Sequence, residues 1–393
     1  MKPFSGIRIV DFTQAHAGSL ATMLLSDMGA EVIKIERAGS GDLARYWAPF
    51  RGENSGYYAF LNRGKKSVSL NLARPEGKQA VKKLIETADV VCENFKYGSM
   101  ERMGLTYEAL REIKPDLIYA SLNGFGQTGP MKQNIGLDLH LQAMGGVMAA
   151  TGFPDGDPVR VGVAFGDHLS GTYMAHAISL ALMERAQTGR GQYIDIAILD
   201  ALFSIQRQNL AGNSGSIVRR GNTSGKYAPC DCFPTRDGWF LLQVTRDEHW
   251  NALCAALHLT DLGARADLSD NAGRMAHSAE LKDTLSRIFA SHERAELEHV
   301  LQAAGVPCSA VNSVAEAMAQ SRSDGLLAEV EDRAMGQLRF PDSHFHIDTV
   351  DTRVKEAAPL RGEHTAFYLS QIGYSRDEIE ALIAGGAAEA AEV

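Results

Sequence analysis

Strand-like and helix-like segments alternate along the first half of this chain, and the alternation limits the folds that it can adopt. The predicted strands are Ile7–Phe12, Glu31–Arg37, Ser67–Leu72, Val90–Glu93 and Leu117–Leu122, and the predicted helices are Ser19–Gly29, Pro75–Ala88 and Tyr107–Ile113. Strands that alternate with helices form βαβ units, whose strands lie parallel in one sheet. The sequence therefore predicts an α/β fold with a mostly parallel sheet, and ligands of such sheets bind outside the carboxyl ends of the strands.

The pattern continues beyond this region with one long helix. That helix is predicted over Asp167–Gln187, and a strand at Gln192–Ile198 and a helix at Leu199–Ile205 follow it. Residues 212–231 are rich in Gly, Asn and Ser, which is typical of a linker or mobile loop. We therefore expect a large domain over residues 1–205.

The rest of the chain predicts a smaller α+β domain and a C-terminal segment. Its expected elements are strand Trp239–Val244, helix Asp247–Leu257, helix Ser278–Gly305 with a break near His292, and strand Cys308–Val311. From about residue 325 the pattern is irregular until a helix at Glu363–Ile372. The low-complexity tail from Gly385 is expected to fray. We predict a linker and small domain over 206–325 and a C-terminal segment over 326–393.

Composition excludes several classes of protein. The formal net charge is −9 at pH 7, which argues against a nucleic-acid partner. No signal peptide opens the sequence and no apolar run approaches the ~18 residues of a membrane span, so no membrane partner is predicted. The five cysteines are scattered, which favours a reducing compartment, the cytoplasm. Cys230 and Cys232 have no second pair at zinc-site spacing, so no metal is predicted.

Basic residues recur near the ends of the predicted strands. They are Arg37, Lys65, Lys66, Arg74, Lys96 and Arg102. Those that follow a strand would converge on one edge of the sheet and form a local phosphate-binding rim. The alternative is that all six are scattered surface charges. The first strand-to-helix turn, "TQAHAGS" (13–19), has one of the three glycines of a dinucleotide fingerprint, which weakens a nicotinamide-dehydrogenase interpretation.

Asp167 lies in "AFGDHLSG" (164–171), between small or apolar residues and the long helix. Aspartate is a favoured N-cap, so the residue could simply begin this helix. A carboxylate at that position is also kept ionised by the helix dipole, and the neighbouring glycines leave room for a ligand. An ionised carboxylate in a cleft can attack an activated acyl group. The local sequence leaves both roles open.

Several stretches together resemble the class III CoA-transferases, the family of the formyl-CoA:oxalate and carnitine CoA-transferases. They are "GIRIVDFTQAHAG" (6–18), "GAEVIKIER" (29–37), "GSGD" (39–42), "SLNLARPEG" (69–77), "ENF" (93–95), "RMG" (102–104), "NGFGQTGP" (123–130), "GDHLSG" (166–171), "TGRGQ" (188–192) and "LRGEHT" (360–365). They occur in the family's order and span nearly the whole chain. The resemblance implies a Rossmann-like large domain, a small domain and a returning terminal segment, with two ring-shaped subunits interlocked in a homodimer.

The resemblance also implies an activity, the transfer of CoA from an acyl-CoA donor to a carboxylic-acid acceptor. Asp167 matches the family's nucleophile, which forms an aspartyl anhydride and then an aspartyl-CoA thioester. A carboxylate suits this role because its acyl form is an anhydride, activated enough to return the acyl group to a thiolate. No permanently bound cofactor is implied, since coenzyme A enters as the acyl-CoA substrate. The donor is expected to be succinyl-CoA or another dicarboxylic thioester.

The family's binding residues transfer to this chain by motif. Gln14, Ala15 and His16 would line the pantetheine and thioester path. Arg37, Arg74, Lys96 and Arg102 would meet the CoA phosphates, with Asn94 close to them. Asp138 and His140, in "GLDLH" (136–140), would shape the substrate pocket.

Two departures from the family pattern leave alternatives open. A run of four glycines that covers the site in formyl-CoA transferase is not evident, and "GNTSGKYAP" (221–229) is its nearest candidate. The α-methylacyl-CoA racemases carry Gly-His-Asp where this chain has Gly136, Leu137 and Asp138, and leucine cannot transfer protons. A racemase would have to use His140 and His168 instead. A non-catalytic CoA-binding paralogue is the third alternative, against which the presence of Asp167 argues.

Overall fold

The computed structural model of the protein describes residues 2–206, 218–319, 327–343 and 347–391. These residues form two compact units. The first contains residues 2–148, 160–206, 327–343 and 347–391, and the second contains residues 149–159 and 218–319. Of the predicted loop over 212–231, residues 212–217 lie outside the described residues. The domain boundaries after residues 205 and 325 stay a prediction.

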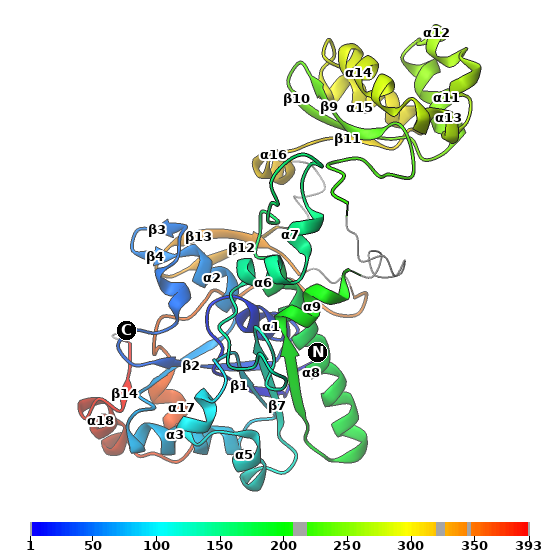
Figure 1. Ribbon diagram of the computed structural model, residues 1–393. Helices are drawn as coiled ribbons and strands as arrows, with labels where there is room; N and C mark the ends of the chain where they lie inside the picture. Colours follow the sequence, from blue (N-terminus) through cyan, green and yellow to red (C-terminus); the bar gives the residue numbers. More distant parts are fainter. Residues whose placement is uncertain (1, 207–217, 320–326, 344–346, 392–393) are drawn as a thin grey trace. The chain divides into compact units, whose positions relative to one another are not determined.

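A seven-stranded sheet organises the first unit (Figure 1). Its strands, in sheet order, are β14 (Ala388–Glu389), β5 (Lys66–Leu70), β2 (Glu31–Arg37), β1 (Arg8–Asp11), β6 (Val90–Glu93), β7 (Ile118–Asn123) and β8 (Tyr193–Ala197). All are parallel except β14, which pairs antiparallel with β5. The parallel strands follow the order 3-2-1-4-5-6 of dinucleotide-binding folds, so the order reverses between β1 and β6. The predicted parallel sheet is confirmed.

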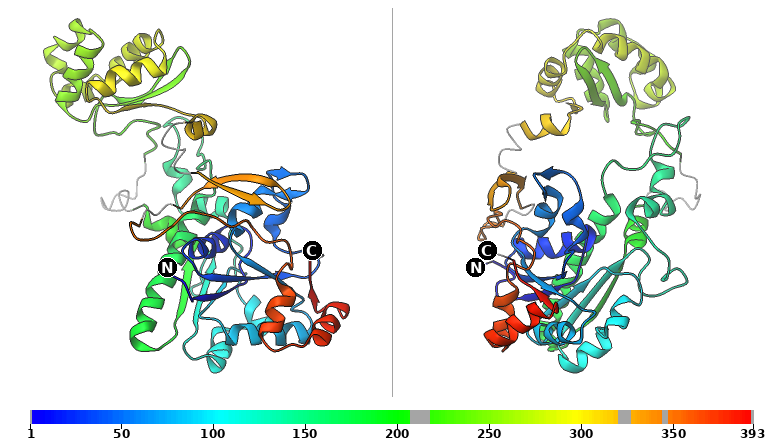
Figure 2. Two further views of the ribbon diagram at one scale, coloured as in Figure 1. Left: turned by 180° about the vertical axis from the view of Figure 1, so that it is seen from behind. Right: turned by 90° about the vertical axis from the view of Figure 1, so that its left-hand side faces the viewer.

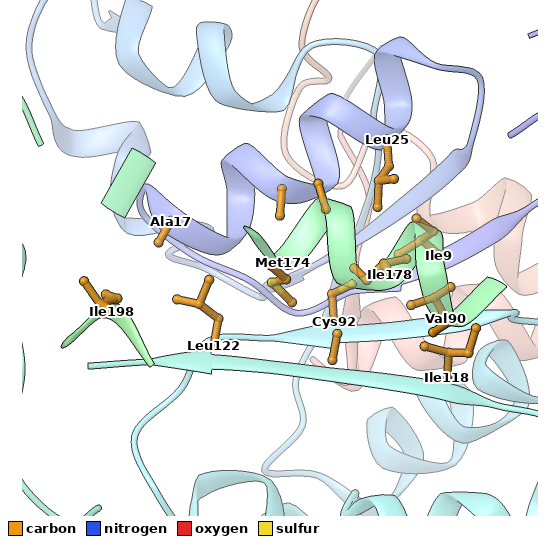
Figure 3. Close-up of a cluster of buried hydrophobic side chains, with 14 of the residues drawn as sticks. Ile9, Ala17, Leu25, Val90, Cys92, Ile118, Leu122, Met174, Ile178 and Ile198 are labelled. Atoms are coloured by element: carbon orange, nitrogen blue, oxygen red, sulfur yellow. The ribbon is translucent and has the colours of Figure 1, made fainter. Parts of the chain in front are cut away.

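Helices cover both faces of this sheet. One face carries α1 (Ala17–Asp27), α8 (Phe165–Thr188) and α9 (Ile198–Ser204), and the other carries α3 (Pro75–Glu86), α5 (Tyr107–Ile113), α17 (Thr365–Gln371) and α18 (Arg376–Ala384). Figure 2 shows α1 on one side of the strands and α17 and α18 on the other. Met174 and Ile178 of α8 pack with Leu122 and Cys92 of the sheet (Figure 3). Each helix is thus fixed by an apolar stripe turned toward the strands.

Helices α1 and α8 approach one another closely near their N-terminal ends, in the first turn of α1 and the second turn of α8. Gly171 makes this possible, because a Cβ there would lie 2.4 Å from the carbonyl oxygen of Ala17. A larger residue would push the helices apart. The close approach brings the residues before α1, among them His16, beside the first turn of α8, which carries Asp167 and His168.

Smaller elements complete the first unit. Helix α7 (Val147–Ala150) spans the boundary between the two units along the chain. The smaller elements of the first unit are the 3₁₀ helix η1 (Leu43–Tyr46), β3 (Phe50–Arg51), β4 (Asn54–Ser55), α2 (Gly56–Asn62), α4 (Ser99–Met103), α6 (Asp138–Met144), β12 (Leu327–Asp332) and β13 (Gly336–Pro341). The last two form an antiparallel hairpin where the sequence predicted irregular structure. Val330 and Phe340 of the hairpin pack in one cluster with Ala59 of α2. The prediction was wrong because the short alternation of apolar and polar residues over 328–331, a strand signal, was overlooked.

The C-terminal tail is also more ordered than predicted. Ala388 is buried and, with Glu389, forms β14 against β5. The Glu389 carboxylate lies 2.6 Å from the Arg361 guanidinium and accepts a hydrogen bond from the Gly39 N–H at 2.7 Å. The expectation of a frayed end was wrong for residues up to 391, because these tertiary contacts outweigh the low complexity of the sequence.

The second unit is a small α+β body. Its sheet has the order β11 (Cys308–Ala310), β10 (Gly238–Gln243) and β9 (Cys230–Thr235), all antiparallel. Its helices are α11 (Asp247–Ala256), α12 (Thr260–Gly263), η2 (Ala266–Leu268), α13 (Asn271–Ala276), α14 (Ser278–Phe289), α15 (Arg294–Ala303) and α16 (Val314–Ala319). The predicted break near His292 is confirmed by the gap between α14 and α15.

Nowhere in the described parts of the chain does a helix have the length and apolar character to cross a membrane.

Candidate active site

A four-residue turn, 13–16, follows β1 at the point where the strand order reverses. Asn94, which follows β6, holds the backbone of this turn from across that point. Its Oδ1 accepts a hydrogen bond from the Gln14 N–H at 2.8 Å, and its Nδ2 donates one to the Gln14 carbonyl at 2.7 Å. The ends of β1 and β6 are thereby tied together where parallel sheets bind their ligands.

Asp167 lies in the first turn of α8, not at its N-cap. The helix begins at Phe165 after Ala164, and the Asp167 side chain caps no backbone N–H of its own helix. The Ser170 hydroxyl donates to the Gly166 carbonyl at 2.8 Å. The predicted N-cap role was therefore wrong by three positions, and the Asp167 carboxylate is left available for another task.

The cap of this helix comes from Asp138, the first residue of α6. Its Oδ1 accepts hydrogen bonds from the Gly166 N–H at 2.7 Å and the Asp167 N–H at 3.1 Å. Its Oδ2 accepts one from Gln142 Nε2 at 2.7 Å. Gly166 allows this approach, since a Cβ there would lie 2.9 Å from Asp138 Oδ1. The structure thus brings together two acids that the sequence predicted as site residues.

The environment of Asp167 favours the neutral carboxyl group, so the expectation that the helix dipole keeps it ionised was wrong. Burial raises the pKa of Asp167 to about 7, and the negative charge of Asp138 adds to the effect. Burial removes water from the charged form, and a like charge nearby makes ionisation costlier still. At neutral pH a substantial fraction of Asp167 is ionised, as a nucleophile requires, and that carboxylate is poorly solvated.

A row of rings lies beside Asp167. The His16 ring is 5.6 Å from the Tyr57 ring and 6.2 Å from the His168 ring, and Tyr57 lies 5.4 Å from Trp47. His16 Nδ1 is hydrogen-bonded to the Tyr57 hydroxyl, while its Nε2 is buried and has no hydrogen-bond partner in the described part of the chain.

Two rings of this row, those of His16 and Tyr57, stay uncharged at neutral pH. Burial and then the neighbouring His168 lower the pKa of His16 to about 4. Burial and the charges of Asp167 and Asp138 raise the pKa of Tyr57 to about 12. A neutral imidazole and a protonated phenol therefore stand next to the carboxylate at neutral pH.

A cavity of about 400 Å³ opens at the carboxyl ends of β1, β2 and β5. Gln14, Arg37 and Arg102 line it together with Lys78 of α3 and apolar residues that include Phe95 and Met103. Basic groups and an apolar wall suit a ligand that carries phosphates and an aromatic base. Gln14 borders this cavity while His16, two residues on, lies beside Tyr57, so one turn joins the cavity to the Asp167 site.

The other predicted contact residues lie elsewhere. Lys96 lines a separate cavity with Glu93, Tyr97 and Tyr193. Arg74 precedes α3 and lies close to Gly386 of the C-terminal segment. His140 is exposed and directs Nδ1 to the Ile135 carbonyl at 3.2 Å, with its ring 6.1 Å from Phe125.

Sequence reasoning overlooked two groups in this region. Tyr57 lies far from the predicted turns, and no local pattern connects it with His16. Lys78 gave a usable signal, because it lies in the first turns of a helix that directly follows a strand. Basic residues there face the edge at which anions bind.

Comparison with known proteins identifies the family of this chain. A family model described as CoA-transferase family III matches residues 4–365. The succinate–glutarate CoA-transferase of Agrobacterium fabrum is 36% identical over 385 residues, which cover 94% of this chain and 96% of that protein. The succinyl-CoA:mesaconate CoA-transferase of Haloarcula marismortui is 36% identical over 388 residues, 95% of this chain and 97% of that protein.

A solved structure shares both sequence and fold. The crystal structure of a CAIB/BAIF family protein from Brucella suis superimposes with a TM-score of 0.87 at 33% identity, over 94% of this chain and 99% of that one. Family model, relatives and fold agree: the chain belongs to CoA-transferase family III and is an enzyme that transfers CoA, of the class that transfers sulfur-containing groups.

Proposed function

We propose that this enzyme moves CoA from an acyl-CoA to a free carboxylic acid by covalent catalysis at Asp167. One observation carries the proposal: Asp167 is a poorly solvated carboxylate, with its pKa raised to about 7, beside the turn that borders the basic cavity. A carboxylate that lacks full hydration is a stronger nucleophile than one in water.

The chemistry proceeds in four balanced steps. The Asp167 carboxylate attacks the thioester carbonyl, which forms a mixed anhydride and releases CoA thiolate. The thiolate attacks the aspartyl carbonyl, which gives an aspartyl-CoA thioester and frees the first acid. The acceptor carboxylate attacks this thioester, which forms a second anhydride and releases the thiolate again. The thiolate takes the acceptor's acyl group and restores the Asp167 carboxylate.

Each neighbour of Asp167 has a proposed part in these steps. Asp138 holds the first turn of α8 and raises the pKa of Asp167 through its negative charge. In the proposed tautomer the Tyr57 hydroxyl donates to His16 Nδ1 and the imidazole proton lies on Nε2, which has no hydrogen-bond partner among the described residues. That N–H would stabilise the oxyanion that develops when the thioester carbonyl is attacked. Gln14 and Ala15 would line the thioester path.

The basic cavity is proposed to hold the nucleotide end of coenzyme A. Arg37, Arg102 and Lys78 line it and would meet the phosphates. Arg74 and Lys96, outside the residues that line this cavity, would act only on a phosphate that extends past its rim. No resident cofactor is needed for this chemistry.

The substrates are proposed to be dicarboxylic. The similar proteins named above are a succinate–glutarate and a succinyl-CoA:mesaconate CoA-transferase. We propose succinyl-CoA or another dicarboxylic thioester as donor and a dicarboxylic acid as acceptor, with His140 toward the outer part of the pocket.

We further propose a homodimer of two interlocked subunits. The exposed side of α8 carries Tyr173, Leu180 and Met183 at helical spacing, with Leu180 51% and Met183 64% exposed. An apolar stripe of this kind marks an interface. Sedimentation equilibrium should give twice the 42.5 kDa mass of the chain, and a single-chain mass would refute the dimer.

All five cysteines are free thiols, which fits the reducing cytoplasm.

Two assays separate this function from α-proton chemistry on the same fold. The first follows labelled succinate into CoA thioester from a second acyl-CoA, and the second follows exchange of the acyl α-proton into deuterated water. We expect transfer without α-exchange, and Asp167→Ala should abolish the transfer. Exchange without transfer would indicate a racemase, and neither activity with intact CoA binding would indicate a non-catalytic paralogue.

A further inference from the structure

Ala15 adopts a backbone conformation that residues with a Cβ rarely take. Its φ is +61°, and His258 is the other non-glycine with positive φ in the described residues. The left-handed region is unfavourable for alanine because Cβ approaches the backbone carbonyl. Such strain persists where surrounding groups enforce it, and it concentrates at functional sites. The surroundings of Ala15 must therefore stabilise this backbone conformation.

Asp42, in the loop after β2, stabilises this conformation of Ala15. Its Oδ1 accepts hydrogen bonds from the Ala15 N–H at 3.0 Å and from the Ala44 N–H at 2.8 Å. Asp42 is fully buried at 1% exposure, and its Oδ2 lies 2.7 Å from the ammonium of Lys34. A buried, charge-paired acceptor has a fixed position, so it fixes the peptide that donates to it.

The two preceding residues of the turn are held in the same way. The Lys34 ammonium donates to the Thr13 carbonyl at 2.7 Å, and Asn94 binds both backbone groups of Gln14. Lys34 also forms an ion pair with Asp42, so the two side chains fix each other's position. Side chains from three segments thus hold residues 13–15, and two of these side chains, Lys34 and Asp42, are joined by an ion pair.

The turn held in this way sets the spacing of the two halves of the site. Gln14 borders the basic cavity, and His16 lies beside Tyr57 and His168. The left-handed residue between them sets the directions in which these two side chains leave the backbone. We propose that Asp42 is a positioning residue that holds Ala15 in the left-handed conformation and so aligns a bound thioester with Asp167. This inference rests on the proposed function.

The test compares Asp42→Ala with the double variant Asp42→Ala/Ala15→Gly. Glycine adopts positive φ without the Cβ penalty, so it should restore the turn when the Asp42 acceptor is lost. The matched control is Asp27→Ala, which breaks the buried Asp27–Arg63 ion pair of 2.7 Å in the same unit. Each variant is assayed for kcat, for KM of the acyl-CoA and for Tm, with Ala15→Gly alone as the reference.

We expect Asp42→Ala to lower kcat by about 10- to 100-fold, as small misplacements of reacting groups do, with KM within about threefold. The double variant should regain about tenfold in kcat without regaining Tm. Asp27→Ala should lower Tm without that loss of kcat. Equal kcat in the single and double Asp42 variants would overturn the inference. A loss of kcat in Asp27→Ala in proportion to its loss of Tm would overturn it too, because the kcat of Asp42→Ala would then report lost stability.

If Asp42→Ala does not fold, Ala15→Val in the full chain keeps the inference testable. A β-branched residue resists positive φ, so kcat should fall by about 10-fold or more. Wild-type kcat in Ala15→Val would overturn the positioning role. Asp167→Ala is assayed beside it, because transfer that survives that change refutes the proposed function instead.

Discussion

Asp138 Oδ1 accepts hydrogen bonds from the backbone N–H groups of Gly166 and Asp167, at 2.7 and 3.1 Å, so one acid of the site caps the helix that carries the other. The contact has two effects. The hydrogen bonds fix the first turn of α8, and the charge makes ionisation of Asp167 costlier. The two effects can be separated by substitution.

Asp138→Asn should retain the cap and remove the charge. The pKa of Asp167, about 7 in the native protein, should then fall, and the acid limb of the pH profile of kcat/KM should move down by about one unit. Asp138→Ala removes the cap as well and should lower the free energy of unfolding by about 1 kcal/mol more. An acid limb that stays near pH 7 in Asp138→Asn would show that Asp138 does not act on Asp167 through charge.

Asp167→Asn should be inactive and, at high pH, more stable than the native protein. The folded-state pKa of about 7 exceeds the ordinary value of 3.8, so the folded state loses stability as pH rises from about 4 through 7. An uncharged isostere avoids this loss. The gain in unfolding free energy should be near zero below pH 4 and about 4 kcal/mol above pH 8. Urea denaturation at both pH values measures it, and equal stability at pH 8 would refute the raised pKa.

His16 is expected to contribute a hydrogen-bond donor and not an acid or base. His16→Ala should lower kcat about 100-fold, the usual effect of an oxyanion donor, whereas His16→Gln retains an N–H and should lose less. Because the pKa of His16 is about 4, the ring stays neutral above pH 5. The acid limb near pH 7 should therefore persist in His16→Gln. Its disappearance would assign that limb to His16.

Lys78 and Lys82 form a matched pair on α3. Lys78 lines the basic cavity, and Lys82, one turn further along, does not. Lys78→Met should raise KM for the acyl-CoA about 10-fold with little change in kcat, since a charged contact to phosphate binds ground and transition states alike. Lys82→Met serves as the control. Equal KM values in the two variants would place the phosphates outside this cavity.

Most of the scaffold could be predicted from local patterns. Val90–Glu93 and Tyr107–Ile113 have the predicted bounds, because short buried runs and amphipathic helices leave periodic signals. The cap of α8 could not be predicted, since its acceptor lies 29 residues before Asp167 and an aspartate already stands near the helix start. The local preference for Asp at an N-cap gave the wrong residue there.

The site could be predicted only where a motif carried it. Asp167, Gln14 and His16 belong to sequence stretches shared with a family, and the structure brings them close together. Tyr57 and Lys78 lie in other segments and reach the site through tertiary packing. Asp42 ends the shared stretch "GSGD" (39–42), but its hydrogen bond to Ala15 follows from tertiary packing as well. Their hydrogen bonds and burial become visible only once β1, β2 and β6 are side by side.

The measurement that tests the central claim most directly is mass spectrometry of the enzyme after incubation with an acyl-CoA and no acceptor. The account predicts a CoA adduct on the peptide that contains Asp167, its loss when an acceptor acid is added, and no adduct in Asp167→Ala. An adduct on another residue, or full CoA transfer by Asp167→Ala, would contradict it.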